Sequence, residues 1–303
     1  MNNINSILKF HRLLSLPDPL HPMISIIKLE DIRFQSDPVL EKFSTDFYSI
    51  SLKKEVKAKM KYGQNLYDFD KGVLSFTAPK QIQTLDLTDT DSENNGAGTG
   101  FALLFHPHFL GKHSVATSIK NYGFFSYSTN EALHLSEKEE KNILDIFLKI
   151  EQEYQHIDKH TQEIIVAQID LLLSYCNRFY ERQFITRKAA NNDLLIKMEN
   201  LLNDYFNDGE SLKEGIPAVD HFASQLNLSP HYLSDMLRSL TGQSTQQHIQ
   251  NKLIEKGKEF LSTTEFSVAE IAYQLGFQYP QSFNKLFKKK TEMSPLEFRR
   301  SFH

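Results

Sequence analysis

Residues 271–289, with the sequence IAYQLGFQYPQSFNKLFKK, indicate how the last third of this 303-residue chain folds. The stretch begins within a set of apolar residues spaced i, i+3, i+4 and i+7, the apolar face of a short helix: Val268, Ile271, Ala272 and Leu275. Gly276 can adopt the left-handed conformation that ends a helix, and Pro280 suits the first position of the next helix. The stretch therefore predicts two short helices joined by a tight turn.

The same pattern occurs a second time, 49 positions upstream, at Val219, Phe222, Ala223 and Leu226. Ala223 coincides with Ala272, and a small residue there allows a second helix to cross closely. Ser229 can cap the next helix, and Pro230 suits its first position. Beyond the turn the offset becomes 50, and three apolar pairs match: Leu233 with Phe283, Met236 with Leu286, and Leu237 with Phe287.

Two copies of one helix-turn-helix unit, at about 216–242 and 265–291, are the simplest account of this repeat. The segment Thr245–Leu261 between the copies contains no proline and carries apolar residues at helical spacing. One long helix should therefore join the copies, with Gly257 as its predicted weak point.

These motifs resemble the AraC/XylS family of bacterial transcription regulators. The resemblance covers about the last third of the chain and is carried by Ile271–Phe277, Ser282–Lys289 and Met293–Arg299, and in the looser first unit by Thr241–Ser244. It implies a DNA-binding domain of two helix-turn-helix units joined by a long helix. Each recognition helix would then enter the major groove on one face of the DNA.

Burial predicts which residues of the recognition helices face DNA, because the apolar residues of each helix must pack inward. In the first recognition helix the outward residues are then His231, Ser234, Asp235 and Arg238. In the second they are Gln281, Ser282, Asn284, Lys285 and Lys288. Gln281 and Asn284 can pair with adenine, and Lys285 suits guanine acceptors or phosphate.

Asp235 departs from the family's pattern, in which a basic or neutral polar residue is frequent at this position. A carboxylate repels phosphate and can only accept hydrogen bonds, so contact by the first recognition helix is the weaker prediction. The family's pattern places Lys288 near phosphate. A run of lysines such as 288–290 is also consistent with a solvated helix face.

The composition is that of a soluble globular protein, with 40% apolar and 24% charged residues and a net charge of −4. From Leu194 onward 12 basic residues face 13 acidic ones, so contact with DNA must be local. Cys176 is the only cysteine, which excludes an intrachain disulfide. The start lacks a signal-peptide pattern, and no segment reaches about 18 apolar residues, which predicts a cytoplasmic location.

Residues 22–130 are predicted to form an antiparallel sheet, because short apolar runs such as Phe47–Leu52 and Gly72–Phe76 end at glycine, proline or aspartate. Asp86–Gly100 is acidic and then rich in small residues, which predicts a loop before a strand at Phe101–Phe105. The family resemblance implies that this region is a cupin-like sensor domain.

His106-Pro107-His108 is similar to the metal-binding motif of some cupins. Pro107 disrupts a strand, however, and no glutamate follows at a suitable spacing. These histidines are therefore predicted to be surface or packing residues. Neither a metal nor a cofactor is predicted.

A helical period begins after Ser136, which can form a capping box with Glu139 and precedes an apolar face of Ile143, Phe147, Ile150 and Tyr154. A second helix, at about 161–183, has a 4-3-4-3 spacing of Ile165, Ile169, Leu172, Cys176 and Phe179. This seam fits two arrangements equally well, a helix packed on its own sheet and a dimer interface. The polar, small-residue stretch 186–193 is predicted to be a linker.

The prediction is an α+β chain: a β-rich, cupin-like sensor domain at 1–133, a helical dimerisation segment at 134–185, a linker at 186–193 and an all-α DNA-binding domain at 194–303. Such a regulator binds double-stranded promoter DNA as a homodimer. A small-molecule effector and, if the protein activates, RNA polymerase are further expected partners, and a membrane is not.

An enzyme is not predicted, because no phosphate-binding loop, nucleophile elbow or pair of histidines at metal-ligand spacing occurs in the sequence. The alternative to a regulator is a dimerising adaptor or sensor whose helix-turn-helix domain no longer binds DNA specifically.

Overall fold

The computed structural model describes residues 2–33, 37–54, 61–62, 65–66, 72–83, 99–128, 131–186 and 188–301. The chain divides into two compact units, Met1–Gln183 and Phe184–His303. The predicted helical segment 134–185 is not a unit of its own, since it falls almost entirely in the first unit together with the sheet. The other predicted domain boundaries stay predictions.

The strands of the first unit are β1 (Asn2–Ile4), β2 (Ile24–Lys28), β3 (Phe43–Thr45), β4 (Tyr48–Lys54), β5 (Lys61–Tyr62), β6 (Asn65–Leu66), β7 (Val73–Thr77), β8 (Thr99–Phe105) and β9 (Leu133–His134). Its α-helices are α1 (Ile7–Leu13), α2 (Val115–Ser118), α3 (Glu137–Gln155) and α4 (Thr161–Thr186). Short 3-10 turns lie at Leu29–Asp31, Pro38–Leu40, Pro107–Leu110, Ile119–Asn121 and Gly123–Ser126.

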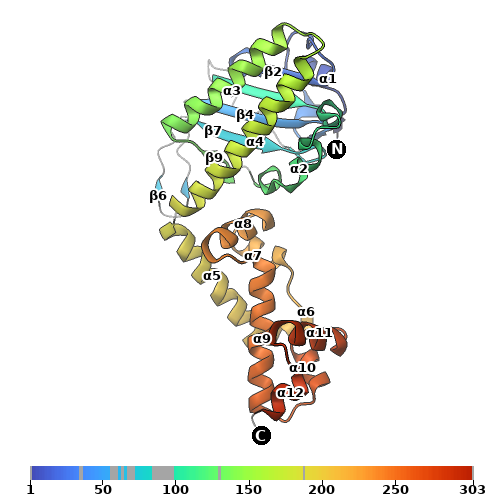
Figure 1. Cartoon of the computed structure of the whole chain (residues 1–303), viewed down its shortest axis with the longest axis vertical. Coiled ribbons are helices and arrows are strands. Elements are labelled where there is room, and N and C mark those ends of the chain that lie inside the picture. Colours follow the sequence, from blue (N-terminus) through green and yellow to red (C-terminus); the bar gives the residue numbers. More distant parts are fainter. Residues whose placement is uncertain are drawn as a thin grey trace. The chain divides into compact units, whose positions relative to one another are not determined.

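An antiparallel sheet in the strand order β2-β8-β4-β7-β9 forms the centre of the first unit. Helices α3 and α4 lie across one face of this sheet (Figure 1). Aromatic contacts join the two layers, with ring centroids 6.0 Å apart for Phe101 and Phe147 and 6.1 Å apart for Phe76 and Tyr180. The α+β fold class is thereby confirmed, whereas the cupin-like form of the sheet stays a prediction.

The opposite face of the sheet is divided into two halves. Over β2 and β8, α1 and the β1–β3 pair bury an apolar cluster that includes Ile7, Phe43 and Leu104. On β4 and β7 the same face carries small hydroxyl side chains, because successive residues of a strand point to opposite faces. These residues are Ser49, Ser51, Ser75 and Thr77.

The chain between β8 and β9 departs from the predicted strands. Residues 107–126 form 3-10 turns and the short helix α2 instead, because Pro107 begins a 3-10 turn that Gly111 ends with a φ of 57°. The Nδ1 atom of His106 accepts a hydrogen bond from the backbone N–H of His108 at 3.2 Å, which gives the histidine motif a structural role. Residues 86–98 of the predicted Asp86–Gly100 loop lie outside the described residues, and its last two residues, Thr99 and Gly100, belong to β8 instead.

Helix α3 begins with the predicted capping box, in which Ser136 and Glu139 bond each other's backbone. The 4-3-4-3 residues of α4 are buried within their own chain: Ile165, Ile169, Leu172, Cys176 and Phe179. This seam therefore packs inside the first unit, and a dimer would have to use another face of the helices. Burial raises the pKa of the Cys176 thiol.

The second unit consists of helices α5 (Lys188–Asn207), α6 (Glu210–Glu214), α7 (Val219–Gln225), α8 (Pro230–Thr241), α9 (Thr245–Thr263), α10 (Val268–Gln274), α11 (Pro280–Thr291) and α12 (Pro295–Arg300). Most of the predicted linker 186–193 belongs to α5, whose Asn191 is buried and donates a side-chain hydrogen bond to the carbonyl of Phe184 at 2.6 Å. No helix among the described residues is both long and apolar enough to cross a bilayer.

The ends of α8 and α11 have the same left-handed backbone conformation but different residues. Gly242 follows α8 with a φ of 76°, and Glu292 follows α11 with a φ of 64°. Only glycine adopts this conformation without steric cost, because it lacks a Cβ atom.

The variant Glu292→Gly should therefore be more stable than the natural chain, by about 1 kcal/mol in the free energy of unfolding. Urea unfolding of the full chain, followed by the helical circular dichroism signal, measures the change. An unchanged or lower midpoint of unfolding would contradict this account of the α11 end.

Candidate nucleic-acid interface

The first helix-turn-helix unit is formed by α7 and α8. Ala223 of α7 is fully buried, as its small size predicted, and Asn227 supplies the turn with a φ of 55°. The Ser229 side chain accepts a hydrogen bond from the backbone N–H of Tyr232 at 3.2 Å and so caps α8, whose first residue is Pro230.

The second helix-turn-helix unit repeats this geometry in α10 and α11. Ala272 is again fully buried, and Gly276 makes the turn with a φ of 86°. Phe283 and Phe287 of α11 are buried with ring centroids 5.5 Å apart, and Phe298 of α12 packs on Phe287 at 5.5 Å. Two copies of one helical unit are therefore present, and both lie where the repeat predicts them.

Helix α9 joins the two copies, with α7 and α8 near one of its ends and α10 to α12 near the other (Figure 1). Gly257, predicted to be a weak point of this helix, has a packing role instead. A Cβ atom at Gly257 would lie 3.0 Å from the ring of Phe283, so the glycine lets α11 approach α9 closely.

The residues predicted to face DNA on α11 are all exposed: Gln281, Ser282, Asn284, Lys285 and Lys288. In the described part of the chain, none of their side chains forms a hydrogen bond or ion pair with another residue. Helix α11 contains four lysines and no acidic residue. Its outward edge therefore combines amide groups, which can pair with base edges, with positive charge that attracts phosphate.

The predicted residues of α8 are arranged differently. His231 and Arg238 are exposed, but the Ser234 hydroxyl donates a hydrogen bond to Thr245 of α9 at 3.0 Å. Asp235 forms an ion pair with Arg238, with a distance of 2.7 Å between Oδ1 and Nη1. The one carboxylate and the one guanidinium of α8 thus neutralise each other.

We expect Asp235→Asn to strengthen DNA binding several-fold at low salt, because it removes a repelling charge and releases Arg238 to contact phosphate. The slope of log affinity against log salt should become steeper by about 0.9, the value for one more neutralised phosphate. Fluorescence anisotropy over a series of salt concentrations measures both quantities.

Asp204→Asn is the matched control, since Asp204 is an exposed acid on α5 and the change in charge is identical. Equal gains in affinity in the two variants would mean that the net charge of the domain, and not the ion pair on α8, limits binding.

Other exposed groups near the recognition helices were not predicted from the sequence. Tyr279 directly precedes α11 and is 60% exposed, and Tyr273 lies exposed on α10. The sequence could have indicated them, because each is an aromatic residue at a position that the apolar repeat places outside the core. Arg299, by contrast, is held by the carbonyls of Leu261 and Phe266, so its charge is used within the domain.

Capping carboxylates account for part of the acidic charge. Glu297 accepts hydrogen bonds from Ser294, and these bonds lower the pKa of its carboxyl group, with Lys288 and Arg300 adding to the effect. Glu270 has the same role at Ser267, where α10 begins. The acidic residues near α11 therefore serve helix ends.

This geometry defines a DNA-binding domain with two helix-turn-helix units. Residues 222–301 match the family described as "Helix-turn-helix domain". The carboxy-terminal part of the chain is a helix-turn-helix domain of the type found in AraC/XylS transcription regulators.

Three similar curated proteins come from two bacterial species. The helix-turn-helix regulator YijO of Escherichia coli K12 is 26% identical over 68% of this chain and 67% of its own length. A regulator in the cgkA 5' region of Pseudoalteromonas carrageenovora is 32% identical over 33% of this chain and 54% of its own length. The transcriptional activator RhaS of Escherichia coli O1:K1 is 28% identical over 46% of this chain and 45% of its own length. The chain thus spans two thirds of YijO and about half of the other two.

Solved structures show distant likenesses. The carboxy-terminal domain of the response regulator yesN of Fusobacterium nucleatum is 29% identical, with a TM-score of 0.32, over 35% of this chain and 98% of that one. A single-residue variant of ToxT from Vibrio cholerae is 15% identical, with a TM-score of 0.30, over 92% of this chain and 97% of that one.

Proposed function

We propose that this transcription regulator recognises promoter DNA chiefly through α11, with α8 as a weaker second contact. The observation that carries the proposal is the exposed edge of α11, where amides and lysines have no partner among the described residues. Asn and Gln side chains can bond adenine in the major groove through paired donor and acceptor contacts, and lysine can bond guanine or phosphate. On α8 the pairing of Asp235 with Arg238 leaves less charge for DNA.

The length of α9 supports contact with two successive major grooves. A helix of 19 residues is about 28 Å long. Successive major grooves on one face of DNA are about 34 Å apart, which is comparable to the separation that α9 gives the two units. Both recognition helices would then contact one duplex.

Binding of the full chain to DNA fragments selected from a random pool tests the proposal. We expect a specific site whose log affinity falls linearly and steeply with log salt, because lysines displace counterions from phosphate. If no sequence is enriched and no binding is measurable at low salt, the protein is the alternative, an adaptor that has lost DNA binding. Enrichment of one sequence with a steep salt slope excludes that alternative.

The regulator is further proposed to be a homodimer, as predicted, but through the outward face of α3 and α4. Large apolar side chains are exposed there: Leu148 is 44%, Ile164 is 39% and Leu171 is 45% exposed. Ile164 and Leu171 are seven residues apart on α4 and so lie on one side of it. A second copy that covers these residues would remove apolar area from water.

We expect Leu171→Asp to shift the full chain from dimer to monomer in sedimentation experiments at micromolar concentration, because it buries a charge in an apolar contact. Leu20→Asp is the matched control, since Leu20 is 56% exposed outside α3 and α4. A wild-type chain that sediments as a monomer, or a Leu171→Asp variant that stays dimeric, would refute this interface.

A small-molecule effector and contact with RNA polymerase are also part of the proposed function as a transcription regulator.

A further inference from the structure

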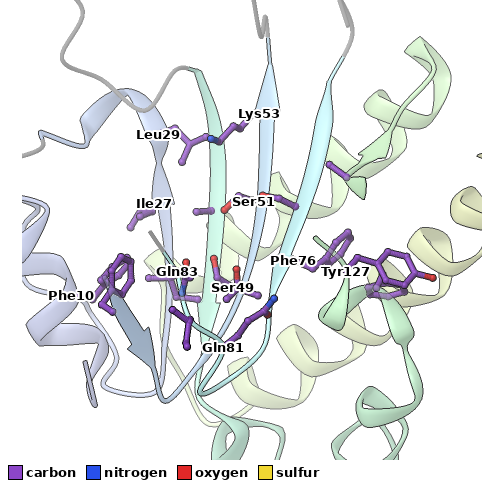
Figure 2. A pocket seen from close by; sticks show the side chains of 18 of the residues that line it. Phe10, Ile27, Leu29, Ser49, Ser51, Lys53, Phe76, Gln81, Gln83 and Tyr127 are labelled. Atoms are coloured by element: carbon purple, nitrogen blue, oxygen red, sulfur yellow. The ribbon is translucent and has the colours of Figure 1, made fainter. Parts of the chain in front are cut away.

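A cavity of about 320 Å³ lies in the first unit, over the hydroxyl-bearing face of β4 and β7, and Tyr180 of α4 also contributes to its lining. This volume is at the lower end of the range of about 300–1,000 Å³ for small-molecule sites. Figure 2 shows Ser49 and Ser51 in the middle of the cavity, with Phe10 and Ile27 on one side and Phe76 and Tyr127 on the other.

The floor of the cavity is a block of hydroxyl groups. Ser49 on β4 is paired in register with Thr77 on β7, and Ser51 with Ser75. In the described part of the chain, no side chain bonds any of these four hydroxyls. A surface of small hydroxyls beside buried apolar residues offers several donors and acceptors at short spacing, as a ligand with several hydroxyl groups requires.

Two amides add to the polar groups at one end of the cavity, where Figure 2 shows Gln81 and Gln83 near Ser49. The Oε1 atom of Gln81 accepts a hydrogen bond from the backbone N–H of Ala78 at 2.9 Å. This bond assigns the amide nitrogen of Gln81 as a donor for other groups.

Lys53 lies at the other end of the cavity (Figure 2). Its neighbour Lys54 points to the helix-covered face and pairs with Glu140 of α3 at 3.9 Å. Lys53 forms no ion pair with any described residue, and the described lining contains no aspartate or glutamate. The carboxylate of Glu30 bonds the backbone N–H of Gly100, the register partner of Lys53 on β8. The described lining of the cavity thus carries one positive charge and no acidic side chain.

We propose that this cavity binds a sugar acid, a small molecule with several hydroxyl groups and one carboxylate. The carboxylate would lie at Lys53 and the hydroxyls over the Ser49–Thr77 and Ser51–Ser75 pairs and the two amides. The apolar C–H face of such a ligand suits the wall of Phe10 and Ile27. The inference deepens the proposed regulation by naming the class of effector, and it rests on that proposal only for the effect of the ligand on DNA binding.

Calorimetric titration of the full chain tests the proposal. The acids galacturonate, glucuronate and gluconate are compared with their neutral counterparts galactose, glucose and glucitol, and with hexanoate, which has the charge without the hydroxyls. We expect at least one acid to bind roughly tenfold or more tightly than its neutral counterpart and than hexanoate, because a hydrogen bond to a charged group contributes more than a neutral one. The proposal is overturned if none of the acids binds, or if no acid binds more tightly than both its neutral counterpart and hexanoate.

Two lysine variants separate this site from general charge attraction. Lys53→Gln should weaken binding of the acid roughly tenfold or more and leave the neutral counterpart unchanged, whereas Lys54→Gln, on the other face of the same strand, should bind as the wild type does. Equal losses in both variants, or none in Lys53→Gln, contradict the proposed site.

Ser51→Leu should abolish binding of both ligands by filling the cavity, and thermal unfolding of each variant shows that it is folded. Unchanged binding in a folded Ser51→Leu variant would also place the ligand elsewhere. DNA takes no part in the titration, so its failure leaves the proposed DNA binding untouched, and failure of DNA binding leaves the titration interpretable.

Discussion

Replacing Asn284 and Lys285 together with alanine should weaken binding to the selected DNA site by roughly a hundredfold or more. A well-placed amide pair with adenine or a lysine contact with guanine contributes about 1–3 kcal/mol to discrimination between bases, and two such losses multiply in the affinity. Both side chains are exposed on α11 and have no partner among the described residues, so their removal should leave the fold intact. Fluorescence anisotropy at one fixed salt concentration measures the loss.

Lys290→Ala is the control for this prediction. Lys290 lies on the same helix, but its Nζ atom is 3.0 Å from Asn251 of α9, which places it on the side that faces the protein. We expect this variant to bind within about threefold of the wild type, because it removes charge without a base contact. If Lys290→Ala loses as much affinity as the double variant, charge alone and not base contact accounts for binding.

Gly276→Ala should destabilise the second unit by roughly 3 kcal/mol or more. A Cβ atom at this position would lie 2.5 Å from the carbonyl carbon of Gly215 and 2.8 Å from the carbonyl oxygen of Ser211, and backbone atoms cannot easily move away. The left-handed conformation adds a cost of about 1–2 kcal/mol for any residue with a Cβ atom. Urea unfolding of the full chain measures the change.

Gly242→Ala separates the two contributions to this cost. Gly242 has nearly the same conformation, but nothing lies within 4 Å of a Cβ atom built there. It should therefore lose only about 1 kcal/mol. Equal losses in the two variants would show that the approach of Gly276 to Gly215 and Ser211 has no steric consequence.

Local signals explain why the compact unit Phe184–His303 was predictable in detail. The caps and turns depend on residues within a few positions of one another, so Pro280 marks the start of α11 and Asn227 and Gly276 mark the turns. The outward edge of α11 followed from the same logic, because Phe283 and Phe287 leave only one face for solvent.

Features that depend on a distant partner were not predictable in this way. Ser234 lies on the outward side of α8 by periodicity, yet its hydroxyl bonds Thr245, eleven residues away on another helix. The glycine at 257 weakens an isolated helix, and only the ring of Phe283 explains its presence.

The first unit gave weaker signals for similar reasons. A heptad-like seam on α4 has the same spacing whether it packs on a sheet or on another subunit, and only the tertiary structure distinguishes these partners. The serines of β4 and β7 alternate with apolar residues as on any half-exposed strand. Their position on the floor of a cavity depends on α1 and on the segment around Tyr127, which the strand pattern does not contain.

The attachment of both recognition helices to α9 constrains the spacing between the two halves of the DNA site, the operator. Ser234 bonds α8 to α9, and Gly257 brings α11 against the same helix, so the separation of the two helices is set by the protein. One base pair inserted between the two halves of the operator would rotate one half by roughly 35° about the duplex axis, since a turn contains about 10–10.5 base pairs. Promoters controlled by this protein should therefore differ in sequence at the half contacted by α8 while the spacing between the halves stays constant.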